Sequence, residues 1–187
     1  MLLDQKRTRR TVQVVAILTS IAFAGVIFVV LGLILFGGGG ESPEDQILAD
    51  ARARVEAEPQ NPAAHEQLAS AYAAKEEYPQ AIDAAERAVA LEPDDLSRVQ
   101  VLVSLQLQSG DAAGAVATLQ QYTADNPEDA EAFLQLGQQA EQAGRTPLAR
   151  LAYQTYLRLD PQSPNADAVR DRLDELAGGG APAAPSG

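Results

Sequence analysis

The sequence predicts an all-α protein in which one long apolar helix precedes a solenoid of repeated helix hairpins. Three observations support this prediction. Residues 11–36 contain no charged side chain. Leucine and alanine recur at matching places in successive segments of the remaining chain, as expected of amphipathic helices that pack alike. Prolines, which end helices, recur every 34 residues, at Pro59, Pro93, Pro127 and Pro161.

The N-terminal part of the chain predicts a membrane anchor. Residues 1–10 form a basic segment, with four cations at Lys6, Arg7, Arg9 and Arg10. The apolar run 11–36 is long enough to cross a hydrocarbon layer about 30 Å thick, because a helix rises about 1.5 Å per residue. Positive charge marks the cytoplasmic flank of such a helix. We therefore expect a single-pass transmembrane helix with its N-terminus in the cytoplasm and the repeats on the other side.

A cleaved signal peptide is the competing interpretation of this segment. The tripeptide Ala22-Phe23-Ala24 resembles a cleavage site, but it lies inside the apolar run, which is longer than the roughly 7–15 residues of a signal core. An uncleaved anchor is therefore preferred. Residues 37–42 form a linker, and its four glycines span only about 11 Å as a random coil. We expect the solenoid, and hence its partner, to lie close to the membrane.

Residues 43–177 are predicted to form the solenoid. Ser42-Pro43 begins a first helix that extends to about Glu58 and covers the front of the stack. Three units of 34 residues follow, at 62–95, 96–129 and 130–163. Their expected helices lie at 62–75, 78–91, 96–108, 111–124, 129–143 and 146–159. A capping helix at 164–177 is expected to start with Ser163-Pro164, and the tail 178–187 is Gly/Pro/Ala-rich and predicted to be disordered.

Residues at equivalent places in the three units carry a family resemblance. Position 7 holds Leu68, Leu102 and Leu136, and position 20 holds Ala81, Ala115 and Ala149. With the proline at position 32, this pattern resembles the tetratricopeptide repeat (TPR) over residues 62–163. The chain departs from the family at position 4, usually a large aromatic residue, and at position 27, usually a small one. These positions hold His65, Val99 and Phe133, and Ala88, Tyr122 and Tyr156.

The resemblance implies a concave groove lined by the first helix of each hairpin. Carried over to this sequence, the candidate peptide-binding residues are Glu66, Ser70, Gln100, Val101, Ser104, Leu107, Glu131, Leu134 and Gln138. Amide and hydroxyl groups can hydrogen-bond a peptide backbone, and an apolar spot at Val101, Leu107 and Leu134 could anchor one side chain. No cation occupies the positions with which one TPR subclass grips a C-terminal carboxylate. The alternative is that these faces are simply solvated and that binding uses the convex side or an edge.

Composition argues against several other classes of protein. Residues 41–187 carry 25 acidic and 10 basic side chains, a net charge of −15, which disfavours nucleic-acid binding. The chain has no cysteine and a single histidine, His65, which occupies a packing position in the family. No phosphate-binding loop or metal-ligand set is present in the sequence. We therefore expect no enzyme, no cofactor and no small-molecule substrate, and a protein or peptide partner instead.

The layout suggests where such a scaffold would act. An anchor followed by a few extracytoplasmic repeats resembles the TPR subunits of bacterial cytochrome c maturation systems, which present haem-free cytochrome to a haem-attachment complex. The resemblance implies a location in the bacterial inner membrane, and the excess of arginine over lysine is typical of GC-rich bacterial genes. Two alternatives stay open: an ancillary chaperone at the protein-export channel, and an assembly factor for an envelope complex.

Overall fold

The computed structural model describes residues 42–178, and every regular element in this range is an α-helix. The predicted basic segment, the apolar run 11–36 and nearly all of the linker and tail lie outside the described residues. Within residues 42–178, no helix is both long enough and apolar enough to cross a membrane.

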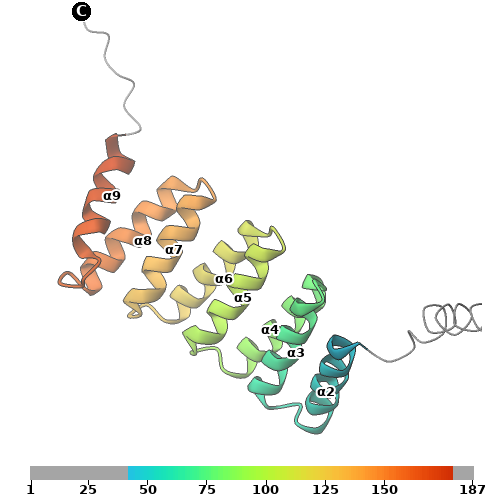
Figure 1. Ribbon diagram of the computed structural model, residues 1–187. Coiled ribbons are helices and arrows are strands. Elements are labelled where there is room, and N and C mark those ends of the chain that lie inside the picture. Colours follow the sequence, from blue (N-terminus) through green and yellow to red (C-terminus); the bar gives the residue numbers. More distant parts are fainter. Residues whose placement is uncertain (1–41, 179–187) are drawn as a thin grey trace, which may run out of the picture. The chain divides into compact units, whose positions relative to one another are not determined.

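Eight helices follow one another in a row through the described part of the chain (Figure 1). They are α2 (Pro43–Ala57), α3 (Pro62–Ala74), α4 (Tyr78–Leu91), α5 (Leu96–Gln108), α6 (Ala112–Asp125), α7 (Ala130–Gln142), α8 (Thr146–Leu159) and α9 (Ala166–Gly178). The pairs α3/α4, α5/α6 and α7/α8 are the three hairpins, and their most extensive contacts are with sequence neighbours. The predicted all-helical solenoid with a flanking helix at each end is confirmed.

Helix starts and hairpin turns repeat with the same period as the prolines. Asn61, Asp95 and Asp129 each cap the first helix of a hairpin, and their side-chain oxygens accept hydrogen bonds of 2.9–3.1 Å from backbone N–H groups. Each cap of this kind stabilises a helix by about 1 kcal/mol. The turns between paired helices hold a residue with positive φ at Glu76, Gly110 and Gly144, so only the first turn carries a side chain there.

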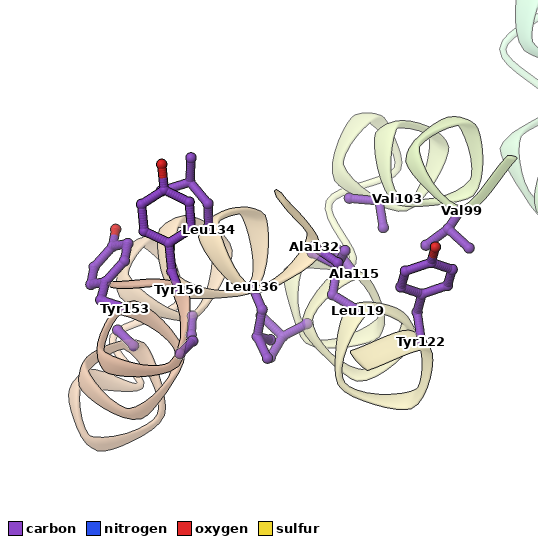
Figure 2. Packing of buried hydrophobic residues seen from close by; sticks show 14 of the residues in the cluster. Val99, Val103, Ala115, Leu119, Tyr122, Ala132, Leu134, Leu136, Tyr153 and Tyr156 are labelled. Carbon is purple, nitrogen blue, oxygen red and sulfur yellow. The ribbon is translucent and has the colours of Figure 1, made fainter. Parts of the chain in front are cut away.

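Alanine determines how closely the helices approach. The alanines of position 20, Ala81, Ala115 and Ala149, are completely buried, and so are Ala69 and Ala132. The largest buried cluster extends from α5 to α9, and in it Leu119, Tyr122 and Tyr156 fill the space between helices (Figure 2). Two smaller clusters lie towards α2, and the partly buried Val89 and Tyr72 pack against neighbouring clusters and so connect them along the stack.

The capping helix differs from its predicted bounds at both ends. It begins at Ala166, not at Pro164, and it extends through Gly178, where the tail was expected to start. The hydroxyl of Ser163 is hydrogen-bonded with the phenol of Tyr156. Ser163 therefore does not cap the helix through its side chain, and a turn closed by Ala166 N and Ser163 O (3.0 Å) precedes the first helical residue.

Gly137 is required by the ring packed against it. A Cβ atom added at Gly137 would lie 2.4 Å from Cε1 of Tyr153, which is 4% exposed and whose hydroxyl donates to Glu141. We expect Gly137→Ala to destabilise the fold by about 1–3 kcal/mol, because the buried ring has to shift. Chemical denaturation monitored by circular dichroism measures this loss. The exposed Gln138→Ala is the control, and equal stability of the two variants would contradict this packing.

Candidate functional site

The candidate site lies on the row formed by α3, α5 and α7, the first helices of the hairpins, with α4, α6 and α8 in the other row (Figure 1). We call the exposed side of α3, α5 and α7 the first-helix face. Five of the predicted peptide-binding residues are exposed polar side chains: Ser70, Gln100, Ser104, Glu131 and Gln138.

Val101 and Leu107 supply the apolar part of this face. Both lie on α5 and both are 37% exposed, which is unusual for large apolar side chains in this protein. Their neighbours are neutral and polar: Gln108 donates to the hydroxyl of Ser104 at 3.0 Å. The middle of the face therefore combines two apolar side chains with amide and hydroxyl groups.

Leu134, the third predicted apolar anchor, is not available on this face. It is only 6% exposed and belongs to the buried cluster that includes Tyr156 of α8 and Val169 of α9. The helix that ends the stack contributes to the same cluster, so this side chain is part of the core. The predicted apolar spot is thus reduced to Val101 and Leu107.

Glu66 is half-buried and already paired within the protein. Its carboxylate forms an ion pair with Arg98 of α5, which also contacts Glu92 at 2.6 Å and Asp95 at 3.3 Å. Hydrogen bonding to Glu92 and Glu66 raises the pKa of the Arg98 guanidinium. Arg98 supplies one positive charge to three carboxylates, so this cluster stays net negative although Glu66 is already paired.

A pocket of about 590 Å³ adds a helix that the sequence analysis did not include in the site. It lies between α2 and α3, and its lining combines Ile47 and Arg54 of α2 with Glu66, Gln67 and Ser70 of α3. Ile47 is 58% exposed, and Arg54 donates to Gln67 at 3.0 Å. The helical spacing of Ile47, Asp50 and Arg54 along α2 is a signal that could have indicated this contribution.

Two further expectations from the sequence concern His65 and metal ligands. His65 is 5% exposed and its Nε2 lies 2.9 Å from the carbonyl oxygen of Pro59, as expected for a packing residue. Among residues 42–178, no group of three or more histidine, aspartate or glutamate side chains could hold a metal ion.

The far end of the face is held by a network that joins three helices. Glu141 of α7 accepts a hydrogen bond from the Tyr153 hydroxyl of α8 at 3.0 Å and forms an ion pair with Arg172 of α9. Hydrogen bonding from Arg172, and then from Tyr153, holds the pKa of the Glu141 carboxyl below its usual value. The ionised carboxylate of Glu141 thus holds α9 against α7 through the ion pair with Arg172.

Comparisons with known proteins agree with this architecture. A sequence model of the tetratricopeptide repeat matches residues 101–164. A tetratricopeptide repeat protein from Parabacteroides merdae is similar in structure, with a TM-score of 0.56 and 18% identity over 71% of this chain and 53% of that one. MamA is similar with a TM-score of 0.51 and 19% identity over 72% of this chain and 90% of that one. At these identities the similarity shows the fold alone, and no curated protein matches the sequence.

The Glu141 network predicts a pH-dependent contribution to stability. Because the folded-state pKa of Glu141 is lowered, its contribution is present above the unfolded value of 4.5 and is lost as the pH falls through the folded value. We expect Glu141→Gln to lower Tm by about 2–5 °C at pH 7 and by less at pH 3. Thermal unfolding at the two pH values measures this, with the exposed Glu128→Gln as control. A difference as large at pH 3 as at pH 7 would mean that the ion pair is not its cause.

Proposed function

The chain is a tetratricopeptide-repeat protein, and on this basis we propose that it is a scaffold that binds an extended polypeptide on the first-helix face. The observation that carries the proposal is the exposure of Val101 and Leu107 among polar side chains. Two exposed apolar side chains on a helix that also exposes amide and hydroxyl groups suit a peptide, because an apolar side chain and the adjacent backbone can be bound together.

Charge favours a basic partner. Residues 41–187 carry a net charge of −15, and no lysine or arginine is among the predicted contact residues. A field of this sign increases the association rate of cationic polypeptides and repels phosphate backbones. Because Glu66 is already paired with Arg98, the attraction comes from the domain as a whole more than from this one carboxylate.

We further propose that the scaffold is tethered to a membrane. The support comes from the sequence: an uncharged run at 11–36, a basic segment before it and an acidic domain after it. In the topology that we propose, the solenoid lies outside the cytoplasm, beside the bacterial inner membrane. Membrane fractionation of the full-length chain and of a chain lacking residues 1–36 tests the tether, since only the full-length chain should sediment with membranes.

Presentation of apocytochrome to a haem-attachment complex is our proposal for the biological role. It is supported by the membrane-proximal layout and by the acidic domain, which suits a basic, haem-free polypeptide. Crosslinking of the full-length protein in its native membrane, followed by mass spectrometry, tests this role. Capture of an apocytochrome or a haem lyase would support it. A spread of unrelated exported proteins would favour the export chaperone, and a single envelope complex would favour the assembly factor.

The first-helix face itself is tested by reversing its apolar character. We expect Val101→Glu combined with Leu107→Glu to weaken binding of haem-free cytochrome c about tenfold or more, because two partly exposed apolar side chains lose their contacts and gain charge. Fluorescence anisotropy with labelled apocytochrome measures the affinity.

Leu151→Glu is the matched control for this experiment. Leu151 is 61% exposed and lies on α8, in the other row of helices. Retained helicity in both variants, with weaker binding only in the double variant, is the expected result. Equal binding by the two variants would move the site away from the first-helix face.

A further inference from the structure

An apolar pocket of about 280 Å³ opens between α4, α5 and α6. Val89 of α4, Val99 and Leu102 of α5, and Tyr122 of α6 line it, and we call it the second-row pocket. Val99 and Tyr122 point toward each other (Figure 2). Three of the four side chains are less than a tenth exposed, so the pocket reaches the core.

The pocket coincides with a departure from the repeat pattern. Val99 occupies position 4 of its unit, where the neighbouring units place rings, His65 and Phe133. Phe133 packs against the large buried cluster, and Val99 belongs to that cluster and also lines the pocket. A pocket of about 410 Å³ lies at the equivalent place of the first unit, where His65 is a lining residue. The second-row pocket differs from it in having valine at position 4 and no cation in its lining, whereas Arg87 lines the other.

Tyr122 cannot easily turn into this space, because its hydroxyl is held at two points. It donates to Asp129 Oδ2 at 3.0 Å and lies 3.2 Å from the carbonyl oxygen of Asp94. Burial and Asp129 raise the pKa of Tyr122 to about 12, so the phenol stays protonated in neutral solution. The Tyr122 ring therefore has a fixed position on one side of the pocket, and the pocket is preformed in the free protein.

Size and charge define what would fit. Pockets for small molecules generally enclose about 300–1,000 Å³, and this one lies at the lower limit, which suits a single apolar side chain better than a cofactor. Glu86 and Asp125 line it, both exposed, and no cation is among its lining residues. Lysine or arginine beside the inserted side chain would complement these carboxylates.

We propose that the second-row pocket is a docking site for a partner polypeptide that inserts one leucine, methionine or phenylalanine side chain flanked by basic residues. The site is separate from the first-helix face, although α5 contributes to both. Val101 and Leu107 are exposed side chains of this helix, whereas Val99 and Leu102 are buried and line the pocket. The scaffold could thus hold a second basic segment while the first-helix face is occupied.

The test uses the full-length chain with labelled valine and leucine methyl groups and the peptide acetyl-Gly-Arg-Leu-Arg-Gly-amide. We expect NMR shift changes at Val89, Val99 and Leu102, and at least tenfold weaker binding when the peptide leucine is alanine or its arginines are glutamates. Changes confined to Val101 and Leu107 would overturn the proposal, as would the absence of any change at millimolar peptide.

Val99→Phe is the decisive variant, because it introduces the residue found at Phe133 and fills the pocket. We expect at least a tenfold loss of peptide binding with unchanged methyl signals at Val101 and Leu107. Undiminished binding would refute the proposal.

If this variant does not fold, Glu86→Lys combined with Asp125→Lys replaces it, since both side chains are exposed. The double variant should then bind the peptide with glutamates more tightly than the peptide with arginines. Val101→Glu with Leu107→Glu should leave this binding intact, which separates the two sites.

Discussion

Close contact between alanine-bearing helices is the constraint on which the rest of the structure depends. Ala81, Ala115 and Ala149 recur at 34-residue intervals and are completely buried, so each hairpin has a small side chain at this place in its packed interior. A hairpin that buries only one side must cover the other by stacking on its neighbour. The stack in turn creates two rows of helices with different surfaces. The row of first helices exposes Val101 and Leu107 among polar groups. The second-row pocket, which Val99 helps to line, opens between α4, α5 and α6.

The fold was predictable because its determinants are local and repeated. Proline spacing, buried alanine and helical periodicity are all visible in the sequence, and they predicted the three hairpins and both flanking helices. The start of α9 was not predictable in the same way. Ser163 looks like a helix cap in the sequence, but its hydroxyl is hydrogen-bonded with Tyr156, a contact that exists only once α8 and the following turn have packed. By contrast, α3 begins at Pro62, as the sequence predicted.

The candidate site was predictable only where exposure follows from helical position. Val101 and Leu107 are exposed as the pattern indicated, whereas Leu134, which occupies position 5 of its unit, is buried in a cluster shared with α9. Glu66 pairs with Arg98, which lies 32 residues away in sequence, and no periodic pattern in the sequence predicts this contact. The pocket beside Val99 depends on three helices and on a tyrosine fixed by Asp129. Residues from three helices meet there only after the hairpins have stacked, so the sequence alone did not predict this pocket.

Contacts between sequence neighbours also bear on how the chain acquires its structure. Each helix packs mainly on the one before it and the one after it, so little of the solenoid requires residues far apart in sequence to meet. Folds with such low contact order form quickly, because short loops are closed before distant ones. The α3/α4 hairpin has its partners once α2 and α5 are available, and it does not need α9. We therefore expect the solenoid to fold progressively from its N-terminal end while the polypeptide is still being synthesised, with α9 completing the stack last.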